Sequence, residues 1–354
     1  MSLLTNSRDR LSPRVDVILP NYNKVEHIDE CLTSLKRQTY EHWRCIVIDG
    51  YSDDGSWERI QDAAAGDERF DLHRLDRIGL YPSWNVGLDR VTGSYFAVLT
   101  SDDVWGETWL QEAVDTLETH QTATTAAART YIIDAESKID DLAMLNRYGE
   151  EILGGGDTRQ VWDGLDFAVA CFFMGSVVTS VHSVVVRSDV LDDLQFPEDA
   201  GIFADWAWIT ELGLLGDIVH CPQARAYWRK YDGQASDGDP GQRAEQGAKL
   251  RTLFEELSVR IADRLKEPGH TAFQQAAQKH LSSYFPFLFR CPSLRAVTAA
   301  PGTAIPHLMQ LAGEYPLVFL KEMLYFLFRQ ERYINKKRKQ LARRSITVSD
   351  RSEY

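Results

Sequence analysis

Apolar and polar positions alternate in blocks along the first 135 residues of the chain. The pattern predicts four strands, at residues 15–19, 45–48, 70–75 and 95–99, and the continuous apolar run at 45–48 is typical of a strand buried on both faces. Between the first two strands, apolar residues recur at spacings of 3 and 4, which mark one face of a helix, and residues 56–65 predict another helix. This order predicts an α/β fold with a mostly parallel sheet and helices on both faces.

The pattern continues less regularly after this block. It predicts, in order, a mobile loop, a strand, a helix and an extended segment, over residues 133–163, 181–186, 203–215 and 218–227. A loop-rich stretch follows, and the chain then has a helical pattern to about residue 344. We therefore predict an α/β catalytic domain over residues 1–235 and a helical C-terminal region over residues 236–354.

Composition narrows the class of partner. The 354 residues are 44% apolar and 26% charged, which is ordinary for a globular protein. The net charge of -13 argues against nucleic acid, because phosphates require a basic surface. The charge is uneven, since residues 329–344 hold eight basic side chains and one acidic one. An acidic body with a basic end predicts that this end meets an anionic surface.

Cysteines and hydropathy bear on the compartment. The five cysteines are scattered without metal-ligand spacing, which is typical of free thiols in a reducing cytoplasm. The first 14 residues lack the apolar stretch of a signal peptide, and no window has the roughly 18 apolar residues of a spanning helix. We expect a cytoplasmic protein, either soluble or peripheral at the inner face of the membrane.

Polar residues gather where three of the predicted strands end. These runs are residues 20–23 after the first strand, 49–56 after the second and 100–103 after the fourth. Ligands of open parallel sheets bind outside the carboxyl ends of the strands. A single run of this kind also makes ordinary turns and helix caps, but three on successive strand ends favour a binding site.

The sequence of these runs resembles one enzyme family. LPNYN, VIDGYSDDGS, GLYPSWNVGL and LTSDD follow one another in the order seen in family 2 glycosyltransferases of the GT-A fold. The resemblance is close over residues 15–110 and loose over residues 180–235. It implies transfer of a sugar, with inversion, from a nucleotide diphosphate donor to a hydroxyl of a glycan or lipid-linked acceptor. It also implies a Mn²⁺ or Mg²⁺ cofactor, and UDP as the favoured nucleotide.

The resemblance assigns roles to individual residues. Pro20, Tyr22 and Asp49 are expected to line the base pocket, Asp102 to contact the ribose or the donor sugar, and Asp103 to bind the metal. The other expected donor-site residues are Asn23, Asp54, Asn85 and Arg229, with His182 near the metal. Carboxylates suit a hard divalent ion, which takes oxygen ligands and neutralises the leaving diphosphate. The alternatives are a helix cap for the two aspartates, before a helix over residues 106–117, and a structural role for His182.

A base for the acceptor hydroxyl is expected in the segment at residues 203–208. It resembles the family's E-D-x-[DE]-x-W-like segment and places Asp205 at the base position, with Ala204 where relatives often have Glu. Base and metal on opposite sides of the anomeric carbon permit in-line displacement. Asp205 could instead be an acid stabilised by a helix dipole. Trp206 and Trp208 could face an acceptor sugar or belong to the core.

Some positions depart from the family pattern. Arg77, Pro82, Ser83 and Val86 replace the residues frequent near the donor sugar, so the donor stays open. Arg229 or Lys230 could clamp the diphosphate as a loop closes.

The C-terminal region ends in a second candidate surface. Leucines at 317, 320, 324 and 327 form an apolar helix face directly before the basic run. Such a helix either lies on an anionic membrane or packs on protein.

We expect the glycosyltransferase to act in bacterial surface polysaccharide synthesis. Two other classes of protein remain as alternatives. One is a catalytically degenerate GT-A protein acting as a scaffold, and the other is a sugar-phosphate nucleotidyltransferase. The nucleotidyltransferase is disfavoured because no glycine-rich loop follows the first strand, and no G-x-G-x-x-G supports an oxidoreductase.

Overall fold

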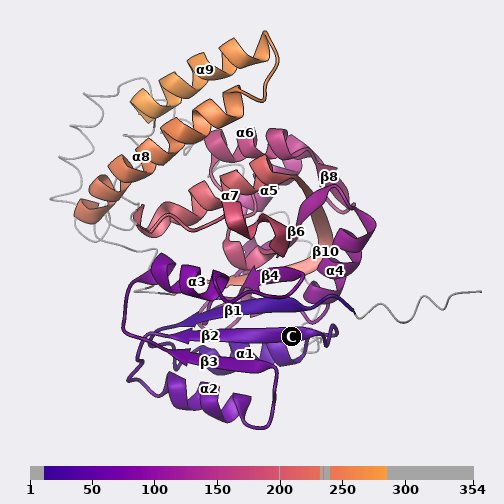
Figure 1. Ribbon diagram of the computed structural model, residues 1–354, viewed down its shortest axis with the longest axis vertical. Helices are drawn as coiled ribbons and strands as arrows, with labels where there is room; N and C mark the ends of the chain where they lie inside the picture. Colours follow the sequence, from indigo (N-terminus) through magenta and orange to yellow (C-terminus); the bar gives the residue numbers. More distant parts are fainter. Residues whose placement is uncertain (1–11, 199, 232–233, 235–239, 285–354) are drawn as a thin grey trace, which may run out of the picture. The chain divides into compact units, whose positions relative to one another are not determined.

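The chain divides into two compact units, Met1–Ala235 and Ser236–Tyr354. The computed structural model describes residues 12–198, 200–231, 234 and 240–284 (Figure 1). No helix in these ranges has the length and apolar content required to cross a membrane.

One mixed sheet organises the first unit. Among the described residues it has ten strands, eight of them in the order β3-β2-β1-β4-β9-β6-β10-β5, with β7 beside β6 and β8 beside β10. The strands are β1 (Val15–Asn21), β2 (Trp43–Asp49), β3 (Phe70–Arg74), β4 (Tyr95–Val98), β5 (Val104–Trp105), β6 (Ala123–Ile133), β7 (Ile139–Leu142), β8 (Gln160–Trp162), β9 (Val184–Arg187) and β10 (Asp217–Arg229).

The two halves of the sheet differ in strand direction. The first four strands, β3, β2, β1 and β4, are all parallel, so their carboxyl ends lie at one edge. Beyond them β9 runs antiparallel to both β4 and β6, while β6 and β10 are again parallel. The α/β fold class predicted from the sequence is confirmed.

The described residues of this unit form seven helices, of which α5 and α6 were not predicted from the sequence. The helices are α1 (Ile28–Lys36), α2 (Ser56–Ala64), α3 (Leu80–Leu88), α4 (Trp109–Thr119), α5 (Met144–Leu153), α6 (Gly164–Met174) and α7 (Ala204–Leu215). Short 3-10 turns occur at Val181–Ser183, Ser188–Asp193 and Gly201–Phe203.

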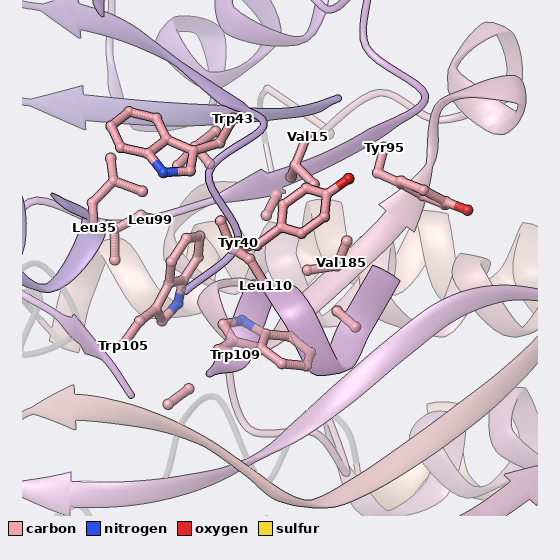
Figure 2. Close-up of a cluster of buried hydrophobic side chains, with 14 of the residues drawn as sticks. Val15, Leu35, Tyr40, Trp43, Tyr95, Leu99, Trp105, Trp109, Leu110 and Val185 are labelled. Carbon is pink, nitrogen blue, oxygen red and sulfur yellow. The ribbon is translucent and has the colours of Figure 1, made fainter. Parts of the chain in front are cut away.

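Both faces of the sheet are covered by helices. On one face, Val15 of β1 belongs to the same core cluster as Leu35 of α1 and Leu110 of α4, around the Trp105 and Trp109 rings (Figure 2). Burial of such large apolar side chains is the main favourable term in folding.

The opposite face is closed by α3 against β1. A Cβ atom added at Gly87 would lie 2.4 Å from Cγ2 of Ile18, so α3 packs closer on β1 than a larger residue would permit.

Three predictions about elements are wrong. The loop predicted for residues 133–163 contains β7, α5 and β8, because β7 and β8 pair antiparallel with β6 and β10 and thereby complete the sheet. The strand predicted from residue 181 begins at Val184, after a 3-10 turn. The helix predicted from residue 106 begins at Trp109, because β5 first pairs with β10.

The second unit is helical where the structure describes it. Its helices α8 (Pro240–Ala262) and α9 (Gly269–Lys279) lie side by side, and a π-helical turn follows at His280–Tyr284 (Figure 1). The helical pattern is confirmed over these ranges. The predicted apolar face at residues 317–327 and the basic run at 329–344 lie outside the described residues.

Candidate functional site

The carboxyl ends of β1, β2 and β4 meet through direct side-chain contacts. Asn21 at the end of β1 donates from Nδ2 to Oδ2 of Asp49 at the end of β2, over 2.8 Å. Lys24, three residues further along, places Nζ 2.9 Å from Oδ2 of Asp102, which follows β4. The three polar runs identified in the sequence therefore form one edge of the sheet.

Asp49 anchors the loops of this edge from inside the fold. It is fully buried, and its carboxylate accepts hydrogen bonds from the Ser52 backbone and hydroxyl at 3.0 and 2.7 Å. Arg74 at the end of β3 donates to it from Nε over 3.1 Å. The guanidinium of Arg74 lies 4.8 Å from the ring centre of Tyr51. Asp49 thus orients Arg74 and the loop after β2 toward the predicted base pocket.

Tyr22 is the open part of that predicted pocket. Its side chain is 38% exposed, and the Arg77 guanidinium lies 4.2 Å from its ring centre. Pro20 is buried within β1. Asn23 has a φ of 52°, in the left-handed region, and its side chain donates to Asp53 over 2.9 Å. Positive φ at a residue other than glycine is uncommon and is often found at functional sites.

Asp54 contributes to the geometry of the loop. Its carboxylate accepts from the backbone N–H of Val25 over 2.8 Å and of Ser56 over 2.9 Å. Burial opposes the effect, but the hydrogen bonds from Ser56 and Val25 lower the pKa of Asp54. It holds the loops after β1 and β2 together at the start of α2.

Asp102 carries a negative charge that is balanced within the site. Its Oδ2 lies 2.9 Å from Lys24 Nζ and accepts from the Tyr231 hydroxyl over 2.7 Å. Burial alone raises its pKa, but the charge of Lys24 and the hydrogen bonds from Tyr231 and Lys24 bring the pKa below the usual value. The Asp102 side chain keeps 20% exposure, so a ligand can reach it.

Asp103 lies deeper than its neighbour. One carboxylate oxygen accepts from the backbone N–H of Arg229 over 2.9 Å, and the other contacts the Thr100 hydroxyl. Burial, and then the charge of Asp102, raise the pKa of Asp103 well above its usual value. The alternative of a helix cap is wrong for both aspartates, because α4 begins at Trp109 and its N-cap residue is Thr108.

His182 lies beside Asp103. Its Nδ1 is 3.1 Å from Oδ2 of Asp103 and 2.9 Å from the Ser180 hydroxyl. Burial lowers the pKa of His182 to about 3, so the ring is neutral at physiological pH. In the described part of the chain its Nε2 is buried and has no hydrogen-bond partner.

A metal ion at this edge would depend on the substrate for part of its coordination. The described residues bring together no group of three His, Cys, Asp or Glu side chains that could hold an ion alone. Mg²⁺ usually takes one or two carboxylates together with substrate phosphates and water. The adjacent Asp102 and Asp103 carboxyl groups fit that arrangement, because a cation there would offset the charge of Asp102 that helps to raise the pKa of Asp103.

Arg229 does not reach the surface of the site. It is 1% exposed, and its guanidinium contacts Glu30, the Asp102 backbone oxygen at 2.9 Å and the Ser137 hydroxyl at 2.7 Å. Its donors are used inside the fold, where burial without such partners would be costly. The predicted clamp on a diphosphate is therefore not available from Arg229 in this conformation, and Lys24 is the cation beside Asp102.

Asn85 is also turned away from the edge. Its side chain donates to the backbone oxygen of Phe196 over 2.9 Å and accepts from the Phe196 N–H over 2.8 Å. It is a buried clamp between α3 and the segment before α7, and the predicted contact with the donor is not available from this position.

Asp205 stands in the first turn of α7 and contacts α3. Its backbone N–H donates to the Tyr81 hydroxyl over 3.3 Å. Burial raises the pKa of Asp205 to about 6, despite hydrogen bonds from Trp206 and Tyr81 that lower it. Because α3 begins just after β3, this contact places Asp205 at the same edge as the carboxyl ends of the parallel strands.

The two tryptophans that follow Asp205 belong to the core. Trp206 and Trp208 are 7% and 1% exposed, and the Trp208 ring stacks on Phe196 at 4.5 Å between centroids. They cannot offer free faces to an acceptor sugar in this conformation.

Similarity to known proteins agrees with this geometry. Residues 16–178 match the family model described as glycosyl transferase family 2. The chain contains a family 2 glycosyltransferase domain over these residues. An uncharacterized glycosyltransferase of Haemophilus influenzae is 25% identical over 246 residues, which are 68% of this chain and 72% of that protein. The putative teichuronic acid biosynthesis glycosyltransferase TuaG of Bacillus subtilis is 34% identical over 104 residues, 29% of this chain and 41% of that protein.

Solved structures share the GT-A fold of this glycosyltransferase. S. aureus TarS 1-349 in complex with UDP-GlcNAc has a TM-score of 0.58 and 18% identity, over 86% of this chain and 82% of that one. The mannosyltransferase PcManGT from Pyrobaculum calidifontis, in complex with GDP-Man and Mn²⁺, has a TM-score of 0.54 and 19% identity, over 95% and 89% of the two chains.

Sequence reasoning missed three residues of this glycosyltransferase that contact the predicted site residues. Lys24 directly follows the NYN run and could have been noticed as a cation next to a polar strand end. Tyr81 lies in the GLYPSWNVGL motif, but its partner Asp205 is 124 residues away in the sequence. Tyr231 gave no local signal, and its partner Asp102 is 129 residues away.

Proposed function

We propose that this glycosyltransferase moves a sugar from a nucleoside diphosphate donor to an acceptor hydroxyl, with a divalent metal ion and with inversion at the anomeric carbon. The observation that carries the proposal is the half-buried Asp205 at the sheet edge, with its pKa raised to about 6. A general base works best when its pKa lies near the operating pH.

The donor would lie across the ends of β1, β2 and β4. Tyr22 offers an exposed ring face for the base, and Asp49 and Arg74 close the end of the pocket. The diphosphate would meet Asp102 and Asp103 beside Lys24. A bound Mn²⁺ or Mg²⁺ would supply neutralisation of the leaving diphosphate.

The reaction would then be a single displacement. The acceptor oxygen forms a bond to the anomeric carbon while its proton passes to the Asp205 carboxylate. The bond from that carbon to the diphosphate breaks, and its electron pair leaves with the nucleoside diphosphate. Attack opposite to the leaving group inverts the configuration.

The acceptor class is proposed from a relative. The TuaG protein, named for teichuronic acid biosynthesis, matches this chain at 34% identity over 104 residues. We propose a bacterial surface glycan or its lipid-linked precursor as acceptor. The basic run at residues 329–344 would bring a peripheral enzyme to an anionic membrane surface.

Nucleotide-dependent thermal stability tests the donor site. Wild type, Asp103→Ala and the surface control Asp115→Ala would be melted with UDP, GDP, dTDP or CMP, each with and without Mn²⁺. We expect one diphosphate to raise the melting temperature in a metal-dependent way, because binding to the folded state stabilises it. That rise should persist in Asp115→Ala and vanish in Asp103→Ala.

Two results would overturn the donor site. One is the absence of any shift with all four nucleotides, and the other is an equal metal-dependent shift in Asp103→Ala. Turnover is measured separately, as release of nucleoside diphosphate from UDP-GlcNAc and from GDP-mannose, the nucleotide sugars bound in the neighbouring structures.

A further inference from the structure

We infer that Tyr81 is a positioning residue for the acceptor-side base, its hydroxyl holding the Asp205 carboxylate in the orientation and ionisation state needed to take a proton. The inference rests on the proposed role of Asp205. It adds a function to the Leu80–Val86 part of α3, because the family resemblance places that motif at the donor site.

The Tyr81 hydroxyl is engaged with Asp205 in two ways. It accepts a hydrogen bond from the Asp205 backbone N–H over 3.3 Å. A phenol hydroxyl also donates one hydrogen bond, and here that bond to the Asp205 side chain lowers the pKa of the carboxyl. Burial and the charge of Asp205 raise the pKa of Tyr81 well above its usual value, so the hydroxyl keeps its proton.

The ring of Tyr81 is held in place by aromatic neighbours. It is 4% exposed, stacks on Phe196 at 5.6 Å between centroids and meets Trp84 edge to face at 5.1 Å. Phe196 in turn stacks on Trp208, three residues after Asp205 on α7. The hydroxyl therefore has little freedom to leave its partner.

Asn85 explains how α3 is fixed against this cluster. It lies four residues after Tyr81, on the same helix face, and its side chain bonds to both backbone groups of Phe196. Tyr81 is hydrogen-bonded to the first turn of α7, and Asn85 is hydrogen-bonded to the segment before α7. One helix thus positions the base by two separate contacts.

A packing role alone would need only the aromatic ring. A buried hydroxyl is costly without a partner, and the partner here is the carboxyl proposed to take the proton. The other groups that act on the pKa of Asp205 are its own backbone N–H and that of Trp206. No charged side chain among the described residues is a cause of that shift, so the phenol is the one side chain that lowers it.

Tyr81→Phe is the direct test, because it removes one oxygen and keeps the ring. The measured quantity is kcat/KM for release of nucleoside diphosphate by hydrolysis of the donor sugar, from pH 5 to pH 9, using the donor that the melting experiments identify. In that reaction water replaces the acceptor hydroxyl, and its proton passes to Asp205. We expect the acid limb of the profile to move up by about one pH unit, as for loss of a hydrogen bond to a charged group.

The shift makes a pH-dependent change in rate. If the pKa rises from about 6 by about one unit, kcat/KM falls about fivefold at pH 6 and is nearly unchanged at pH 9. Tyr40→Phe is the matched control, because Tyr40 is also buried and its hydroxyl donates to the Pro13 backbone oxygen, away from the site. That variant should keep the wild-type profile even if its melting temperature falls.

Three results separate the possibilities. An unshifted acid limb in a folded Tyr81→Phe protein, with or without a uniform loss of rate, would overturn the positioning role. A similar shift in Tyr40→Phe would also overturn it, because the effect would then not be specific to Asp205. If Asp205→Asn hydrolyses the donor like wild type, the proposed base itself fails, and the inference fails with it. Nucleotide-induced melting shifts in each variant confirm that the donor site is intact.

Discussion

Asp102 after β4 and Asp205 at the start of α7 are the same residue type at one edge of the sheet, yet the fold shifts their pKa values in opposite directions. Lys24 and Tyr231 lower the pKa of Asp102 against the effect of burial, whereas burial dominates at Asp205 and raises its pKa to about 6. The first stays an anion, and the second is poised to accept a proton.

The difference shows how one fold can carry two carboxylate chemistries. Asp102 has a cation at 2.9 Å, and no charged side chain among the described residues is a cause of the shift at Asp205. Two carboxyl groups whose environments separate their pKa values are a common basis for distinct catalytic roles. The donor side of the site has an ion pair between Lys24 and Asp102, and the acceptor side has a carboxyl group that is hydrogen-bonded by the Tyr81 hydroxyl.

Asp205→Asn should give the largest effect, because it removes the proposed base. We expect turnover to fall by about 10²–10⁴-fold, the usual contribution of general base catalysis. Nucleotide affinity should stay within about twofold, since no donor contact is assigned to Asp205. Nucleoside diphosphate release and calorimetric titration with nucleotide measure the two quantities. Turnover equal to that of wild type would show that Asp205 is not the base, and the proposed difference in role between Asp102 and Asp205 would be wrong.

The pH dependence of wild-type turnover should reflect the protonation of Asp205, and the protonation of Asp102 should not contribute to it. Below the pKa of about 6, kcat/KM should fall about tenfold per pH unit, because protonated Asp205 cannot accept the proton. Asp102, with its lowered pKa, remains ionised throughout this range. A rate profile that is flat between pH 5 and pH 8 would contradict the assignment.

Lys24→Met should affect the donor side alone. Loss of the ammonium leaves Asp102 without its counter-charge and removes a cation from the proposed diphosphate position. We expect nucleotide binding to weaken by about tenfold, the loss typical of one charged contact. Lys36→Met is the control, because Lys36 lies in the last turn of α1 and contacts the Ala63 backbone oxygen and the Phe70 ring. Equal affinities in the two variants would remove Lys24 from the donor site.

The smallest expected effects concern stability, and they have opposite signs. The pKa of Asp205 is raised in the folded state, so its ionisation opposes folding as the pH rises through about 6. Asp205→Asn should therefore melt a few degrees above wild type at pH 8, with a smaller difference at pH 5. The pKa of Asp102 is lowered, so its charge stabilises the fold above the usual carboxyl pKa.

Asp102→Asn should accordingly melt below wild type at pH 8. Melting curves of both variants without nucleotide or metal measure the pair of shifts. A change of the same sign in both variants would mean that the two carboxyl groups do not differ as described.

Local pattern was sufficient for much of the fold. The strands predicted at residues 45–48 and 95–99 and the helix at 56–65 agree with β2, β4 and α2 to within one or two residues at each end. These elements carry long apolar runs or regular spacing, and such signals are contained within the segment itself. The same regularity brought the motif residues Asp49, Asp102 and Asp103 to the strand ends.

Prediction failed where an element depends on a distant partner. The segment at residues 133–163 has many charges and glycines, so its pattern resembles a loop, yet β7 and β8 become strands by pairing with β6 and β10. Arg129 of β6 also contacts α5, because its Nε lies 2.6 Å from Oε1 of Glu150. This ion pair neutralises the charge of Glu150, one of the charged residues that made the segment resemble a loop. These contacts join residues that are far apart in the chain, so the sequence of the segment alone does not reveal them.

The sequence by itself determined the order of strands and helices over residues 15–119 and the edge at which the polar runs meet, because periodicity and strand direction are local properties. The resemblance to the family added the candidate residues Asp102, Asp103 and Asp205. Only the tertiary structure decided which side chains stay open to a ligand. It buried Arg229 and Asn85, placed Lys24 at Asp102 and set Tyr81 against Asp205. Burial, hydrogen-bond partners and pKa shifts arise from contacts between residues far apart in the chain, and these contacts exist only once the chain has folded.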